Sequence, residues 1–162
     1  MAGNELTFND NEFIVSKTDT AGKITYGNEL FISMSGYTED ELLHAPHNIL
    51  RHPDMPASVF KMLWKRINDK EEVFAYVINK TKENDYYWVF AHVTPSFDSR
   101  GNIIGFHSVR RKPNREALSV IQPLYRSMLS AEKIGGMAAG EKKLTAALDQ
   151  MKVNYDEFIL SL

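Results

Sequence analysis

The stretch PHNILRHPDMP, residues 46–56, holds three prolines, two histidines, one arginine and one aspartate in eleven positions. Proline interrupts regular structure, and charged side chains are poor core material. The segments on both sides of this stretch have helical patterns. The sequence therefore predicts a stiff, polar loop between two helices.

The segment before this loop predicts a β-hairpin followed by two short helices. The runs FIVSKT and KITYGN are rich in β-branched and aromatic residues, and the DTAG between them places Gly22 at a turn. A short helix follows and ends at Gly36. Thr38 and Glu41 have the spacing of a capping box, which predicts the start of a second helix.

The segment after the loop predicts one longer helix and three strands. We expect the helix to begin with Asp54 as its N-cap, because an apolar stripe at helical spacing follows: Phe60, Leu63, Trp64 and Ile67. The strand patterns are VFAYVINK, YYWVFAHVTPSF and NIIGFHSVRR. This order predicts an α+β domain with a five-stranded antiparallel sheet and short helices on one face.

The residues from 113 to 162 predict a helical tail. Pro123 is expected to kink or split the first helix, and the run IGGMAAG is expected to be a flexible joint. The last stretch has apolar residues at heptad spacing, namely Leu144, Leu148, Met151, Tyr155, Phe158 and Leu162. Such a helix either folds back on its own domain or pairs with another chain, and the narrow seam favours pairing.

Composition excludes several classes of function. The formal net charge is −2, so a generic nucleic-acid binder is not expected. The chain has no cysteine, which excludes disulfides, cysteine-bound metals and thiol chemistry, and favours a cytoplasmic location. We see neither a signal peptide nor a run of about 20 apolar residues that would insert in a membrane.

Three segments together, GKITYGNELFISMSGYTEDEL, PHNILRHPDMP and DYYWVFAHVTP, resemble a PAS domain. More narrowly, they resemble the FAD-binding PAS domains of bacterial aerotaxis and energy-taxis receptors. The resemblance runs from about Phe13 to Arg111, implies a PAS fold and does not cover the tail. We therefore expect an N-terminal cap at 1–12, a PAS sensory domain at 13–112 and a helical signalling or interaction tail at 113–162. The resemblance also implies a membrane-bound chemotaxis-type signalling protein as partner, which would bring the protein to a membrane indirectly.

The resemblance also implies cofactor-binding residues. Arg51, His52 and Asp54 match the family positions that are linked to FAD, and Asn28 and Trp64 match two further family positions. Physically, Arg51 is a forked donor suited to phosphate, and the prolines would hold the loop in one shape. The helix that starts near Asp54 would add free N–H groups. Without the resemblance, RHPD is an ordinary structural loop.

Strand alternation gives further candidates, because a flat ring needs small side chains beneath it. The expected faces carry Ala75, Val77 and Asn79 on one strand, then Tyr87, Val89, Ala91 and Val93, and then Ile103, Gly105, His107 and Val109. Asn79 suits the imide edge of a flavin. By resemblance to light-oxygen-voltage flavin domains, His107 would contact the ring near N5. Phe60 and Trp64 would cover the ring.

These observations predict a cytoplasmic redox sensor that holds FAD and acts through its tail, with no catalytic residues and no metal site. FMN is an alternative cofactor. A haem-binding gas sensor is a second reading, because His44 and His47 lie beside the expected pocket. A cofactor-free interaction module is the third, with Asn79, Trp64 and His107 in structural roles. A homodimer through the tail is an alternative to the signalling partner.

Overall fold

The computed structural model describes residues 3–162, so residues 1 and 2 of the expected N-terminal cap lie outside it. Its strands are β1 (Ile14–Thr18), β2 (Ile24–Gly27), β3 (Val73–Lys80), β4 (Tyr86–Phe97) and β5 (Ile103–Arg111). Its helices are α1 (Glu29–Ser35), α2 (Glu39–Leu42), the 3₁₀ helix η1 (His47–Leu50), α3 (Ala57–Asn68), α4 (Arg115–Met151) and α5 (Tyr155–Leu160).

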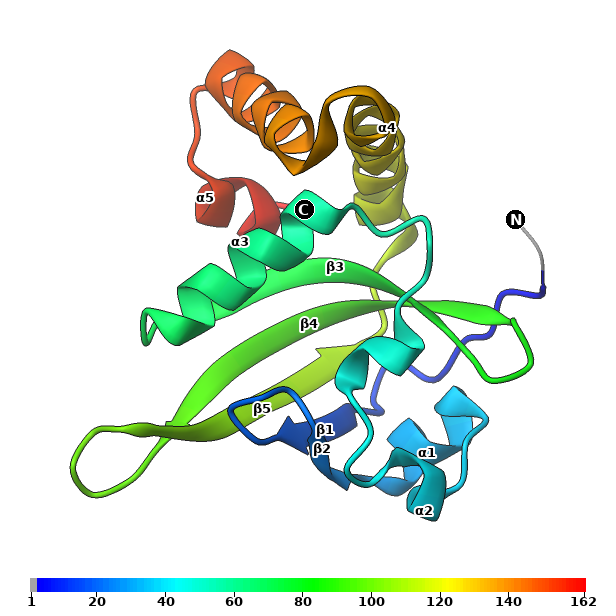
Figure 1. Cartoon of the computed structure of the whole chain (residues 1–162). Coiled ribbons are helices and arrows are strands. Elements are labelled where there is room, and N and C mark those ends of the chain that lie inside the picture. Colours follow the sequence, from blue (N-terminus) through cyan, green and yellow to red (C-terminus); the bar gives the residue numbers. More distant parts are fainter. Residues whose placement is uncertain (1–2) are drawn as a thin grey trace.

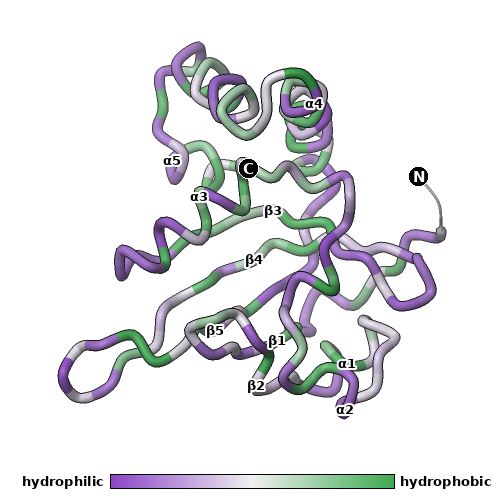
Figure 2. The backbone as a smooth tube through the Cα atoms, viewed as in Figure 1, coloured by the Kyte–Doolittle hydropathy of each residue, from purple (hydrophilic) through white to green (hydrophobic). Residues whose placement is uncertain are grey.

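The five strands form one antiparallel sheet in the order β2-β1-β5-β4-β3, and α3 crosses one of its faces (Figure 1). This confirms the predicted α+β class and the five-stranded sheet with short helices. The turn between β4 and β5 is hydrophilic and projects away from the body of the molecule (Figure 2). No helix in residues 3–162 is long and apolar enough to span a bilayer.

The two short helices begin and end where their sequences predict. Asn28 caps α1 by accepting a hydrogen bond from the Phe31 N–H at 3.0 Å, and Gly36 ends the helix with φ of 76°. In α2, Thr38 and Glu41 form the predicted capping box. Local hydrogen bonding therefore accounts for both elements.

The start of α3 differs from the prediction. The helix begins at Ala57 after Pro56, so Asp54 is not its N-cap. The N–H groups of Ala57 and Ser58 instead donate to the Glu132 carboxylate, at 2.9 and 3.0 Å. Glu132 belongs to α4 and lies 74 residues from Ser58, which is why no local pattern reveals it. The expectation that these N–H groups are free for a phosphate is therefore wrong.

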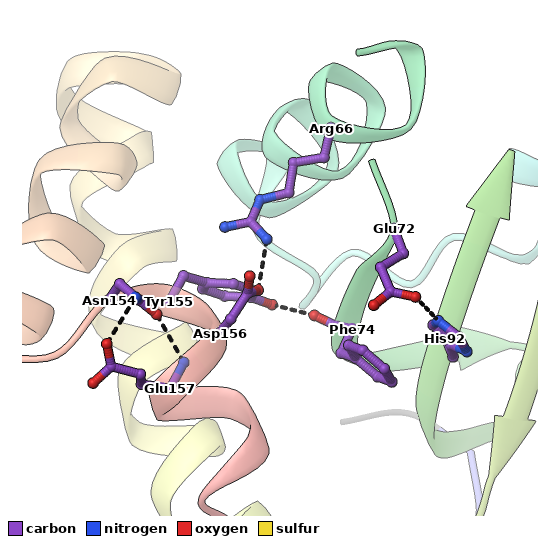
Figure 3. Close-up of polar contacts among 8 residues, drawn as sticks. All are labelled: Arg66, Glu72, Phe74, His92, Asn154, Tyr155, Asp156 and Glu157. Carbon is purple, nitrogen blue, oxygen red and sulfur yellow. Dashed lines mark hydrogen bonds and ion pairs between the residues drawn. The ribbon is translucent and has the colours of Figure 1, made fainter. Parts of the chain in front are cut away.

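The tail helices pack against the edge strand β3 and against α3. The hydroxyls of Tyr125 and Tyr155 donate to the carbonyl oxygens of Tyr76 at 2.6 Å and Phe74 at 2.8 Å. Figure 3 shows Tyr155 reaching Phe74, beside the ion pair of Arg66 with Asp156 at 2.6 Å. These hydroxyls occupy edge carbonyls that would otherwise be open to another strand.

The residues of the predicted heptad seam, from Leu144 to Leu162, do not lie on one continuous helix. Lys152 adopts a left-handed conformation with φ of 58°, and Asn154 caps the new helix α5. Leu144, Tyr155 and Phe158 are buried against the same chain, so the favoured reading of a seam open to another chain is wrong for these residues. For these residues the structure agrees with the other reading, in which the tail folds back on its own domain.

The break within α4 lies in the run IGGMAAG, where a joint was predicted, and not at Pro123. The helix continues through Pro123, and its only non-helical residue is Gly136, with φ of 71° and ψ of −166°. That conformation is accessible to glycine but strained for other residues. The chain turns there so that the second half of α4 returns toward α3, as Figure 1 shows.

Candidate functional site

A cavity of about 390 Å³ lies between α3 and the face of the sheet that α3 crosses. This volume is within the range of pockets that hold small organic molecules. The loop at 46–51, the β1–β2 turn and Met137 of α4 complete the walls. The tail thus contributes a residue to the cavity wall.

The floor of the cavity consists of small side chains. Val77 comes from β3, Ala91 and Val93 from β4, and Ser108 from β5. In an antiparallel sheet, directly paired residues point to the same face, and the register pairs Val77 with Val89 and Val93 with Ser108. The predicted inward faces of β3 and β4 are therefore correct.

The predicted inward face of β5 is wrong, and so is the placement of His107. The residues that line the cavity from β5 are Phe106, Ser108 and Arg110, so His107 lies on the opposite face. Gly105 misled the prediction because its small size suggested room for a ring. A Cβ at Gly105 would lie 2.4 Å from the Thr18 carbonyl oxygen, so this glycine serves the close approach of β1.

The ceiling of the cavity is the apolar face of α3. Phe60 and Trp64 line it, and the indole of Trp64 meets Phe106 edge-on with ring centroids 5.5 Å apart. Trp64 remains 38% exposed although it belongs to the apolar stripe, so it is not a plain core residue. Both aromatic residues are where the sequence predicted them.

One end of the cavity is polar. Three buried atoms at or beside this end have no hydrogen-bond partner within the described chain: Asn79 Nδ2, Arg110 Nε and the OH of Tyr87, which pairs with Asn79 in the β3–β4 register. All three can donate, and an unsatisfied buried donor costs about 1–3 kcal/mol. Asn79 and Arg110 line the cavity, and burial raises the pKa of Tyr87 to about 12, so its hydroxyl keeps its proton. This end is complementary to a ligand edge that accepts hydrogen bonds.

Arg51 also lines the cavity, at the surface. Its backbone bridges to Asn79 of β3, which places the proline-rich loop beside the polar end. The guanidinium stacks over Phe60 at 4.8 Å from the ring centroid, and it forms no ion pair with any carboxylate of residues 3–162. Its charge is therefore available to an anion.

The other two polar residues of the loop do not line the cavity. His52 is buried, its ring meets Tyr86, and its Nδ1 accepts a hydrogen bond from the Asp54 N–H at 3.0 Å. Burial lowers the pKa of His52, so the ring is not poised as a cation. The Asp54 carboxylate lies 4.0 Å from His52 Nδ1. In this structure the two residues shape the loop, and neither lines the cavity.

Asn28 is also remote from the cavity wall. Besides capping α1, its Oδ1 accepts from the Val15 N–H at 3.1 Å and its Nδ2 donates to the Phe13 carbonyl oxygen at 2.8 Å. The bonds to Val15 and Phe13 hold the start of α1 against β1 and the residue before it. Asn28 therefore has a structural role here and does not line the cavity.

Sequence reasoning missed Arg110 entirely and considered His47 only as a haem ligand. Arg110 pairs with Ala91 in the β4–β5 register, so the alternation already assigned to β4 would have pointed it into the cavity. His47 lines the cavity, its Nε2 lies 3.0 Å from Ser16 Oγ, and its pKa is lowered to about 3 by burial and by Arg110. His44 is exposed and outside the cavity wall.

A flat cofactor with acceptor atoms at one edge fits this arrangement. The small floor leaves room for a ring, α3 supplies aromatic cover, and Asn79 and Arg110 bring unpartnered donors to one end of the cavity. No group of three or more metal-ligating side chains gathers within residues 3–162.

Comparisons with known proteins agree with this architecture. The family model described as PAS fold matches residues 24–110, more than half of the chain. The aerotaxis receptor of Escherichia coli strain K12 is 37% identical over 119 residues, which cover 74% of this chain and 23% of the receptor. The chain thus spans less than a quarter of the length of that relative.

Solved structures show the same fold. The light-state structure of the blue-light photoreceptor Aureochrome1 LOV has a TM-score of 0.60 at 19% identity, covering 68% of this chain and 88% of the other. A light-oxygen-voltage domain studied with a flavin analogue also has a TM-score of 0.60, at 18% identity, covering 71% and 86%. At this identity the likeness concerns the fold alone.

Proposed function

The chain belongs to the PAS fold family, and from that premise we propose that it is a redox sensor that holds FAD between α3 and the sheet. The observation that carries the proposal is the cavity itself, with a floor of small residues and the unpartnered buried donors of Asn79 and Arg110 at one end. An isoalloxazine ring matches it, because the ring has an apolar end and a pyrimidine edge that accepts hydrogen bonds.

Different residues of the cavity would contact different parts of the cofactor. Ala91 and Val93 leave space beneath the ring, Phe60 and Trp64 cover it and exclude water, and Asn79 fixes the polar edge. Arg51 would meet the diphosphate, since it is the exposed cation of the cavity wall that lacks a carboxylate partner in residues 3–162. Bound FAD would supply reversible two-electron redox chemistry.

Two connections would carry a change in the cavity to the tail. Strand β5 contributes Ser108 and Arg110 to the wall and leads directly toward α4, which begins at Arg115. Glu132 of α4 holds the first N–H groups of α3, the helix that covers the ring. A differential free energy of about 1–3 kcal/mol between two arrangements is enough for several-fold regulation.

We also propose that a membrane-bound chemotaxis-type signalling protein receives this signal through α4 and α5. Large hydrophobic side chains remain exposed on these helices, including Ile134 at 94% and Leu160 at 58%. Ile134→Asp is expected to reduce co-sedimentation with membranes that contain such a protein. Unchanged co-sedimentation would remove Ile134 from the contact, and a stable homodimer in solution would favour the alternative partner.

The direct test is the absorbance spectrum of the purified protein, with acid release and identification of the chromophore. We expect a yellow protein that releases FAD, or a colourless one that takes up FAD more tightly than FMN. A Soret band would indicate haem instead. A protein that is colourless and does not take up added FAD would contradict the proposal.

A further inference from the structure

Arg110 is a buried cation that the fold alone does not explain. Its side chain is 3% exposed, and it lines the cavity next to Ala91, its partner in the β4–β5 register. Burial lowers the pKa of the guanidinium to about 10, so it is still charged near neutral pH. The polar end of the cavity therefore carries a permanent positive charge.

Every partner of Arg110 within the described chain is neutral. One guanidinium nitrogen donates to Ser16 Oγ, another lies 3.4 Å from His47 Nε2, and the group stacks 5.1 Å from the Phe31 ring centroid. The pKa of His47 is lowered to about 3, so that ring carries no charge. No carboxylate of residues 3–162 pairs with Arg110.

Arg110 Nε has no hydrogen-bond partner among residues 3–162. A guanidinium has five N–H donors, and the contacts to Ser16 and His47 use only part of them. A buried charge without a counter-charge is unfavourable, whereas the same charge becomes favourable when a ligand supplies the anion. The cavity thus selects for a ligand that carries or acquires negative charge at this end.

We propose that Arg110 stabilises the negative charge that reduction places on the pyrimidine ring of the bound flavin, and so sets the reduction potential of the sensor. This inference rests on the proposed function. Oxidised FAD would take up two electrons from a reductant such as dithionite and one proton at N5, to give the anion FADH⁻. Next to a fixed positive charge N1 would stay deprotonated, whereas in a buried site without that charge desolvation disfavours the anion, so N1 would take a second proton to give FADH₂.

The groups that face Arg110 would not obscure this proton count. They are His47 from η1, Tyr87 from β4, Ser16 from β1 and Asn79 from β3. The pKa of His47 lies near 3 and that of Tyr87 near 12. Between about pH 6 and about pH 9 neither of them titrates. His107 of β5, whose pKa is lowered by burial and by charges that include Arg110, lies on the opposite face of the sheet and does not line the cavity, so the protons taken up at the cavity are those of the flavin.

The test is a reductive titration of the FAD-loaded protein with dithionite as electron donor and a reference dye, repeated across this pH range. The variants are Arg110→Gln and Arg110→Lys, with Arg111→Gln as control, because Arg111 is exposed and outside the cavity wall. The wild type and the control should take up one proton per two electrons. Arg110→Gln should take up two protons, and Arg110→Lys should keep one.

Arg110→Gln should also hold the reduced cofactor at least tenfold more weakly relative to the oxidised one, which lowers a two-electron potential by about 30 mV. The proposal is overturned if Arg110→Gln keeps the potential and proton count of the wild type. It is also overturned if the wild type takes up two protons, a result that needs no folded variant. Failure of the wild type to bind FAD would instead overturn the proposed function.

Discussion

Two arginines line the same cavity and differ in most other respects. Arg51 is exposed on the proline-rich loop, stacked on Phe60, while Arg110 is buried in β5 among neutral groups. An exposed cation is solvated before a ligand binds, so it contributes mainly affinity. A buried cation has already lost its water, so its charge acts strongly on any charge that appears beside it. We therefore expect Arg51 to govern how tightly the cofactor binds and Arg110 to govern its redox properties.

The largest expected effect comes from removing the space that both arginines share. Ala91 is 2% exposed and forms part of the floor, so Ala91→Leu would fill the cavity with side-chain atoms. FAD affinity should fall at least about 100-fold, which corresponds to about 2.8 kcal/mol. The FAD affinity is measured by fluorescence titration. The control is Thr94→Leu, on the other face of β4, and equal affinity for Ala91→Leu and wild type would place the flavin elsewhere.

Arg51→Ala is the next largest change, and it separates the two arginines. Loss of hydrogen bonds to a charged diphosphate costs about 1.5–3 kcal/mol, so FAD affinity should fall by about 10- to 100-fold. The affinity for FMN, which lacks the diphosphate bridge, should fall less, and the reduction potential should not change. Arg111→Ala is the matched control. A shifted potential in Arg51→Ala would break the proposed division of roles.

A third prediction concerns how folding stability depends on pH through His47, at the polar end of the cavity. The unfolded chain protonates His47 near its ordinary pKa of about 6.5, whereas the folded chain does so only near 3. The unfolded state therefore binds more protons in this window, and stability falls as pH falls from about 6.5 to about 3. Each pH unit contributes about 1.4 kcal/mol.

His47→Gln should remove about 2 kcal/mol of the stability lost between about pH 6.5 and about pH 5, as measured by urea unfolding. Carboxylates and other histidines contribute equally to both proteins, and so the difference belongs to His47. His44→Gln, at an exposed position, is the control and should leave the pH dependence unchanged. An unchanged pH profile in His47→Gln would mean that this end of the cavity is wetter than its contacts indicate.

The smallest expected effect lies away from both arginines. Tyr155→Phe removes one hydrogen bond from α5 to the Phe74 carbonyl and should lower the free energy of unfolding by about 1 kcal/mol. FAD affinity should not change, because Tyr155 does not line the cavity. Tyr26→Phe, at a residue 46% exposed, should be neutral. A loss of FAD affinity in Tyr155→Phe would show that α5 is coupled to the cavity in addition to the two connections through β5 and Glu132.

The parts of the fold that the sequence predicts well depend on neighbouring residues. The turn at Gly22, the end of α1 at Gly36 and the capping box of Thr38 and Glu41 each involve residues a few positions apart. The start of α3 was wrong because Glu132, far along the chain, supplies the contact that a local cap would have made. The tail seam was wrong because Lys152 interrupts the helix.

In the candidate site, too, local patterns were predicted well and long-range contacts were not. Phe60, Trp64, Asn79 and Arg51 were placed at the cavity from a helical stripe, a strand alternation and a motif. His107 was misplaced because alternation within one strand gives two faces but not which of them points inward. Only the pairing of β4 with β5 decides that, and it selects Arg110. Whether a charged residue of a strand is buried can be decided only once the sheet register is known.

The most direct test of the account is a crystal structure of the protein with FAD bound. We predict the flavin ring between the Ala91 face of the sheet and α3, its pyrimidine edge toward Arg110 and Asn79, and its diphosphate at Arg51. A ring with its dimethylbenzene edge toward Arg110, or a cofactor bound outside the cavity, would contradict the central claim.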